Sequence, residues 1–125
     1  MAYLVDTDIL IDFFRCNEAA TDYLDSLGEW SVSVVTAMEL VAGAKDKNEV
    51  QDIDLMLAAY RSIPLNEDVG NLAYNLMKSY SKSHGLEPPD ALIAATAIHE
   101  GLKLSTLNRK HFGAIGRLEI EVPEY

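Results

Sequence analysis

The sequence has little cysteine, and it has no long apolar run and no secretory signal. Its one cysteine, Cys16, has no partner for a disulfide within the chain, so we expect a protein of a reducing compartment. The longest stretch without strongly polar residues, Ala91 to Ile98, is far shorter than the roughly 20 residues of a membrane helix. The N-terminus lacks a basic segment followed by a long apolar core. These absences predict a cytoplasmic protein that does not enter the membrane.

Basic residues are also scarce. The chain has 10 lysines and arginines against 20 aspartates and glutamates, which gives a formal net charge of -10. This balance argues against a protein that holds nucleic acid by a broad basic face, because attraction to phosphate dominates such binding. It permits clustered carboxylates that hold a metal, a basic protein partner, or a merely solvated acidic surface. The positions of the acids must decide between these.

Enough apolar sequence is present for one folded domain over residues 1–125, since 49% of the residues are hydrophobic. Strands are predicted at 2–5, 30–35, 63–65, 102–105 and 118–122. Helices are predicted at 9–14, 19–27, 37–44, 50–60 and 69–84, after Pro88-Pro89, and as a short turn at 109–112. This alternation predicts an α/β fold with a parallel sheet and helices on both faces.

Four candidate site residues fall where predicted strands end or where helices begin. Asp6 ends the first strand, and Glu39 lies in the first turn of the helix after the second strand. Asp90 lies in the first turn of the helix after the two prolines, and His111 comes just after the strand at 102–105. Ligands of an open parallel sheet bind outside the carboxyl ends of its strands, so these residues could converge at one edge.

Several of these polar residues also have a local explanation. Thr36 and Glu39 match a capping box, in which the glutamate reaches back to the first turn. Asp90 suits a helix N-terminus, where the macrodipole favours a negative charge. Asp8 could be the N-cap of the first helix, and Asn108 the N-cap of the short turn that follows it.

Asp6 has no such explanation, because an acid at the inner end of a buried strand must be desolvated and gains nothing there from capping. If Asp6, Glu39 and Asp90 converge, two of these charges about 4 Å apart cost roughly 4 kcal/mol at an effective dielectric of 20. A positive ion must offset that cost. Carboxylate ligands without cysteine suit Mg²⁺ or Mn²⁺ better than zinc, and such an ion can activate water for attack on a phosphate.

Four segments in this order resemble the motifs of the PIN-domain ribonucleases: VDTDIL, TAMELVAGA, PPDALIAATA and LSTLNRKHF. At this length the chain is similar to the VapC-like toxins of bacterial toxin–antitoxin pairs. The resemblance implies a PIN-like three-layer sandwich and a metal-dependent endoribonuclease, with Asp6, Glu39 and Asp90 as metal ligands. Water would attack the phosphorus in line and leave a 5′-phosphate; the general base, a carboxylate or the metal hydroxide, stays open. The resemblance also implies an antitoxin whose basic tail reaches the acidic cleft, and a homodimer.

The chain departs from the family's motifs at two positions. Asp8 stands where a small polar residue is usual, so it is either an additional acceptor near the metal or the helix cap described above. His111 stands where a fourth acid is frequent, which places a second metal ion in doubt because imidazole is a poor ligand for Mg²⁺. His111 could orient water, contact the scissile phosphate or lie solvated. Thr106 and Asn108 are expected to form hydrogen bonds around the site.

An acidic chain needs a local basic rim to hold RNA, and we expect binding that weakens steeply with salt. The candidates lie in segments next to the predicted mouth: Arg15, Lys45, Lys47, Arg109 and Lys110.

Three other functions compete with this prediction. Asp6-Thr7-Asp8 resembles the nucleophile motif of haloacid-dehalogenase-like phosphotransferases, but residues 102–112 supply Lys103 without the acidic pair of that class. A phospho-receiver domain needs an acceptor aspartate after a middle strand, and residues 63–66 contain none. A catalytically inactive PIN-like binding module is the third alternative, and His111 keeps it open.

Overall fold

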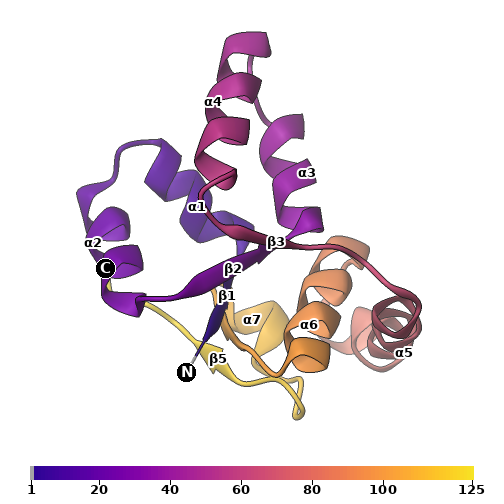
Figure 1. Cartoon of the computed structure of the whole chain (residues 1–125). Coiled ribbons are helices and arrows are strands. Elements are labelled where there is room, and N and C mark those ends of the chain that lie inside the picture. Colours follow the sequence, from indigo (N-terminus) through magenta and orange to yellow (C-terminus); the bar gives the residue numbers. More distant parts are fainter. Residues whose placement is uncertain (1) are drawn as a thin grey trace.

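A five-stranded parallel sheet in the order β3-β2-β1-β4-β5 forms the centre of the computed structural model, which describes residues 2–125 (Figure 1). The strands are Tyr3–Val5 (β1), Trp30–Ser33 (β2), Arg61–Ile63 (β3), Lys103–Ser105 (β4) and Ile120–Glu121 (β5). In the register, Leu4 lies opposite Ser31 on one side and Leu104 on the other. The strand order reverses between β1 and β4, and this is the position at which parallel sheets bind ligands.

Helices cover both faces of the sheet, as the alternation of the sequence predicts (Figure 1). They are Thr7–Phe14 (α1), Glu18–Leu27 (α2), Val34–Ala42 (α3), Lys47–Leu57 (α4), Glu67–His84 (α5), Pro88–Glu100 (α6) and Arg109–Phe112 (α7). Successive side chains of a strand point to opposite faces, so Leu4 packs in a core with α5, α6 and α7 while Val5 packs in a second core with α1, α2 and α4. No helix among residues 2–125 is long and apolar enough to cross a membrane.

The second strand is shorter than the predicted 30–35, and the helix after it starts earlier than the predicted residue 37. Helix α3 begins at Val34, directly after β2, and Ser33 is its N-cap because the Ser33 side chain accepts a hydrogen bond from the Val35 amide at 3.1 Å. The predicted capping box of Thr36 and Glu39 is therefore wrong. Thr36 is fully buried inside α3, and Glu39 lies in its second turn.

Helix α6 carries Asp90 in its first turn, as predicted. Two prolines occupy the first helical positions, where the fixed φ of proline suits a helix start and its missing N–H costs nothing. The helix then buries a series of small residues against the sheet and against α5: Ala91, Ala94, Ala95 and Ala97. The close packing that these alanines permit brings the start of α6, with Asp90, to the edge where β1 and β4 end.

Candidate active site

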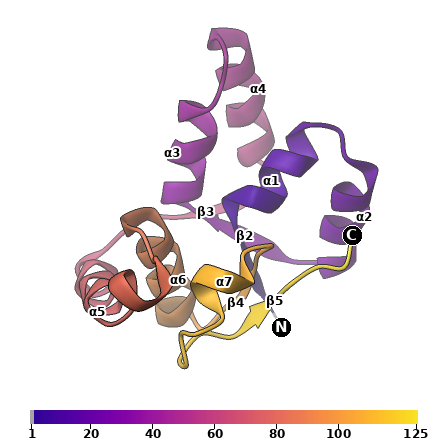
Figure 2. The same ribbon diagram turned by 180° about the vertical axis from the view of Figure 1, so that it is seen from behind.

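The helices α1, α3, α6 and α7 meet around the carboxyl ends of β1 and β4, and Figure 2 shows this side of the molecule. Helix α1 follows β1 directly, and α7 follows β4 after a short loop. Each of the four helices carries one or more of the candidate residues. The edge predicted from the sequence is therefore the edge at which they lie.

Asp6 lies at the end of β1 and is also the N-cap of α1. One carboxylate oxygen accepts a hydrogen bond from the Thr7 amide at 2.8 Å, and the other accepts one from the Thr106 hydroxyl at 2.7 Å. The predictions that Asp6 has no capping role and that Asp8 caps the first helix are both wrong, because the helix starts one residue after the strand ends. Asp6 is 6% exposed, so this cap is buried.

The charge of Asp6 is poorly compensated. The pKa of its carboxyl is raised from 3.8 to about 7, first by burial and then by the charges of Asp8 and Asp90, while the hydrogen bonds from Thr106 and Thr7 lower it. No lysine or arginine within residues 2–125 forms an ion pair with Asp6. A cation bound beside Asp6 would reverse the shift.

Glu39 is tied to the start of α1 by a threonine that the sequence analysis missed. The Thr7 hydroxyl donates a hydrogen bond to Oε1 of Glu39 at 2.7 Å and lies 3.0 Å from the hydroxyl of the buried Thr36. Thr7 lies between the two acids of VDTDIL, and this position could have indicated that its hydroxyl belongs to the site. Through Thr7, Glu39 is held next to the backbone of Asp6.

Asp90 contacts His111. Oδ2 of Asp90 lies 3.1 Å from Nδ1 of His111, and the Asn108 side-chain nitrogen lies 3.0 Å from the same Nδ1. Asn108 is the N-cap of α7, as predicted, because its Oδ1 accepts a hydrogen bond from the His111 amide at 3.1 Å. The imidazole is therefore fixed by its own helix cap and faces Asp90 rather than open solvent.

Asp8 faces the loop that follows β4. Its Oδ2 accepts a hydrogen bond from the Leu107 amide at 3.1 Å and lies 3.4 Å from the Thr106 hydroxyl. Burial raises the pKa of Asp8, and the hydrogen bond from Leu107 lowers it. Asp8 thus interacts with residues near the site and not only with its own helix.

The donor atoms at this edge are carboxylate oxygens, hydroxyl oxygens and one imidazole, and this set suits a hard divalent cation. Within residues 2–125, however, the side chains of histidine, cysteine, aspartate and glutamate form no group of three that could hold a metal ion as they are placed. Each candidate acid instead forms a hydrogen bond with a hydroxyl or with the imidazole. A common metal site of Asp6, Glu39 and Asp90 stays a prediction.

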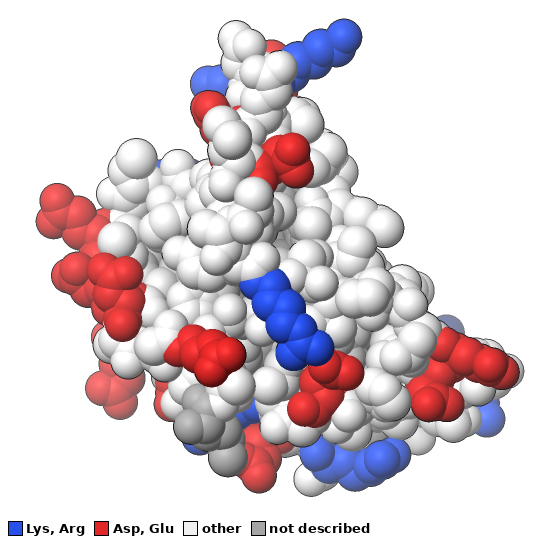
Figure 3. Space-filling view, in the orientation of Figure 1, with Lys and Arg blue, Asp and Glu red and all other residues white. Residues whose placement is uncertain are grey.

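The predicted basic rim is not continuous. Arg109 and Lys110 are exposed on α7, next to His111. Lys45 and Lys47 lie at the tip of the α3–α4 hairpin, the end of the hairpin farther from the sheet (Figures 1 and 3). The acidic side chains that gather over α2 in Figure 3 form a solvated surface, which accounts for part of the net charge.

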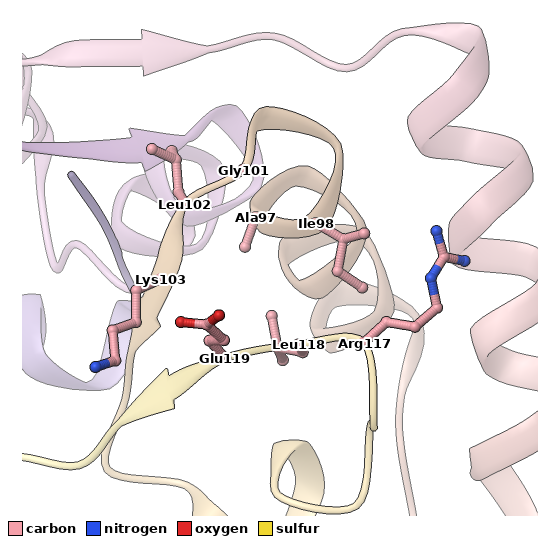
Figure 4. A pocket seen from close by; sticks show the side chains of 8 residues that line it. All are labelled: Ala97, Ile98, Gly101, Leu102, Lys103, Arg117, Leu118 and Glu119. Carbon is pink, nitrogen blue, oxygen red and sulfur yellow. The ribbon is translucent and has the colours of Figure 1, made fainter. Parts of the chain in front are cut away.

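A groove of about 470 Å³ lies between α1 and the α3–α4 hairpin, beside the candidate site, and Arg15 and Glu39 line it. Its other side chains are apolar or acidic: Ile11, Phe14, Leu40, Ile53, Glu49 and Asp52. A second cavity of about 120 Å³ lies at the opposite end of β4, where Lys103 and Glu119 approach it (Figure 4). It is remote from the acids described above.

Comparison with known proteins agrees with this geometry. The PIN domain family matches residues 3–118 of the chain. The chain belongs to the PIN-domain family. This PIN domain is 38% identical over 120 residues to "Ribonuclease VapC10" of Mycobacterium tuberculosis, an alignment that covers 93% of this chain and 90% of that protein.

Solved structures show a similar fold. A "Toxin-antitoxin complex from Klebsiella pneumoniae" superposes with a TM-score of 0.81 at 32% identity and covers 93% of this chain and 94% of that one. The structure of "VapBC2 from Rickettsia felis bound to a DNA fragment from their promoter" gives a TM-score of 0.82 at 25% identity, with coverage of 99% and 100%. The predicted PIN-like α/β fold is confirmed, and the haloacid-dehalogenase-like alternative is not supported.

Proposed function

We propose that this PIN domain is a metal-dependent endoribonuclease toxin that a cognate antitoxin inhibits. The observation that carries the proposal is Asp6: a buried carboxylate at the reversal of strand order, with its pKa raised to about 7 and two further acids close enough to raise it. Relatives named ribonucleases and neighbours solved as toxin–antitoxin complexes support the same function. We expect it to act in the cytoplasm.

Asp6 and Asp90 would hold a Mg²⁺ or Mn²⁺ ion, with Glu39 completing the acidic set. Such an ion, when bound, lowers the pKa of water and stabilises negative charge on a phosphate. The protein's own groups prepare the site for it. Thr106 and Thr7 fix the carboxylates of Asp6 and Glu39 by short hydrogen bonds, so little rearrangement entropy is lost on binding.

His111 and its neighbours act on the substrate side of this site. The imidazole is fixed by Asn108 and contacts Asp90, so it is in position to orient water or to contact the scissile phosphate. Arg109 and Lys110, both exposed on the same short helix, would contact the phosphates of a bound RNA. The products would be a 5′-phosphate and a free 3′-hydroxyl. Because few basic residues are available, RNA binding should weaken steeply as salt increases.

The groove beside Glu39 is where we place the antitoxin. Apolar side chains form part of its wall, and Glu39, Glu49 and Asp52 give it an acidic character. Those properties fit a segment that carries both apolar and basic side chains, as expected of an antitoxin tail. We also expect a homodimer, and the exposed apolar side chains of Met38 and Val41 on α3 are candidates for burial in it.

The proposal is tested by incubating the purified chain with an end-labelled RNA in the presence of Mg²⁺, Mn²⁺ or a chelator. We expect cleavage with either ion, none with chelator, and a loss of at least 100-fold in Asp6→Asn and Asp90→Asn. Asp54→Asn is the matched control, because Asp54 is an exposed acid on α4 outside the site and the groove. Cleavage by Asp6→Asn and Asp90→Asn at the wild-type rate would reject the proposal and indicate a contaminating nuclease.

A further inference from the structure

Asp8 connects the start of α1 with the loop that follows β4, although these two segments lie far apart in the sequence. Its Oδ1 accepts a hydrogen bond from the Ile9 amide at 2.8 Å, which belongs to its own helix. Its Oδ2 accepts one from the Leu107 amide at 3.1 Å, across 99 positions of sequence, and lies 3.4 Å from the Thr106 hydroxyl. A helix cap alone would need only the first of these contacts.

The segment that Asp8 reaches, residues 106–108, holds both sides of the candidate site. The Thr106 hydroxyl donates to Asp6 at 2.7 Å and accepts a hydrogen bond from the Asn108 amide at 3.0 Å. The Asn108 side chain in turn fixes His111, which contacts Asp90. The position of this short loop therefore sets the partners of Asp6 and of Asp90 together.

The loop has few other anchors. The Thr106 amide donates a hydrogen bond to the carbonyl of Glu121 in β5 at 3.0 Å, and this bond holds the start of the loop to the sheet. The Leu107 side chain is 37% exposed, so it is not part of either buried core. The bond from the Leu107 amide to Asp8 is thus what joins the middle of the loop to α1.

We infer that Asp8 is a positioning residue that fastens the loop 106–108 to α1 and thereby keeps Thr106 on Asp6 and His111 on Asp90. The inference rests on the proposed function for its effect on catalysis. Asp8 reaches the loop directly through its Oδ2, so we assign its effect to the position of the loop. What matters at this position is a hydrogen-bond acceptor of the length of aspartate, not the negative charge.

Two substitutions separate the acceptor from the charge. Asp8→Asn keeps the length and one carbonyl oxygen but removes the charge, whereas Asp8→Ala removes both. In Asp8→Ala we expect amide hydrogen exchange at Leu107 to accelerate about tenfold or more and kcat to fall about tenfold, with KM for a short RNA nearly unchanged. In Asp8→Asn both quantities should stay within about threefold of the wild type.

Asp12→Ala is the matched control, because Asp12 lies one turn further along α1 and carries the same charge. Its carboxylate accepts a hydrogen bond from the Tyr125 hydroxyl at 2.8 Å and does not reach the loop. Exchange at Leu107 and the cleavage rate should therefore be unchanged in this variant. If Asp8→Ala does not fold, Asp8→Ser replaces it, since a serine hydroxyl keeps a polar helix start but is too short to reach Leu107.

The inference is overturned if Asp8→Ala leaves exchange at Leu107 unchanged, because the loop would then not depend on Asp8. It is equally overturned if Asp8→Asn loses as much kcat as Asp8→Ala while Leu107 stays protected, because the charge would then be the active property. A wild-type protein that cleaves no RNA would refute the proposed function alone. Amide hydrogen exchange at Leu107 needs no substrate, so it still tests the contact between Asp8 and the loop.

Discussion

Replacing Asp6 by asparagine should make the metal-free protein more stable at high pH. In the folded chain the pKa of Asp6 is raised from 3.8 to about 7, mainly by burial and then by the charge of Asp8. The folded state therefore binds more protons than the unfolded state between these two pH values, and the free energy of unfolding must fall as pH rises through that window. Above pH 7 the whole penalty is present, and below pH 4 it is absent.

The size of the effect follows from the shift. A change from 3.8 to about 7 is about 3 pKa units, which at 1.36 kcal/mol each is a penalty of about 4 kcal/mol for the ionised carboxylate. Asparagine has no charge to desolvate, but its amide satisfies the Thr106 and Thr7 donors less well, a loss of about 1–2 kcal/mol. Asp6→Asn should thus be more stable than the wild type by about 2–3 kcal/mol at pH 8, and less stable than it by about 1–2 kcal/mol near pH 4.

The assay is urea unfolding followed by circular dichroism, in chelator, at pH 4, 6 and 8. The wild type, Asp6→Asn and the control Asp54→Asn are compared at each pH, so that the titration of all other groups cancels. The reasoning is refuted if the difference between wild type and Asp6→Asn is the same at every pH, or if Asp6→Asn is the less stable protein at pH 8. Addition of Mg²⁺ at pH 8 should stabilise the wild type and leave Asp6→Asn unchanged.

Three further substitutions test other parts of the site and the core. Thr7→Val removes the hydroxyl that donates a hydrogen bond to Glu39, so we expect about tenfold weaker Mg²⁺ binding by calorimetry and a loss of stability of only about 1 kcal/mol. Unaltered Mg²⁺ binding would show that Glu39 does not depend on this hydrogen bond. His111→Asp adds a fourth carboxylate beside Asp90 and should raise the affinity for Mn²⁺ or the number of ions bound; calorimetry that finds neither would contradict this geometry. Phe112→Ala empties a fully buried position between α7 and the sheet and should cost about 3–5 kcal/mol in urea unfolding, and a cost below about 1 kcal/mol would contradict the packing described.

The sequence was sufficient to predict the order of strands and helices along the chain and the edge of the sheet near which the candidate acids lie. Those features follow from periodic burial and from the rule that parallel strands end at one edge, so no knowledge of side-chain contacts is needed. Asp90 could be placed in the first turn of its helix because Pro88 and Pro89 define that start. Asn108 could be assigned as a cap for the same kind of local reason.

The details that the sequence analysis missed depend on a boundary between strand and helix. Valines suit strands, so Val34 and Val35 were assigned to the second strand, yet Ser33 ends that strand and caps α3. The N-cap role of Asp6 was missed for the same reason. Because α1 follows β1 with only Asp6 between them, this residue both ends the strand and caps the helix. The contacts of Thr7 with Glu39 and of Asp8 with Leu107 join residues 32 and 99 positions apart, so they depend on how the helices pack against each other.

The hydrogen bond between Asp6 and Thr106 spans 100 positions, because β1 and β4 are neighbours in the sheet although they lie near opposite ends of the chain. During synthesis, the ribosome releases the first acid long before the strand that shields it has been made. A nascent or truncated chain that stops before Lys103 therefore lacks the loop, the histidine and the basic helix together. We expect such fragments to be harmless to the cell that produces them, so that toxicity begins only after β4 and α7 have been translated.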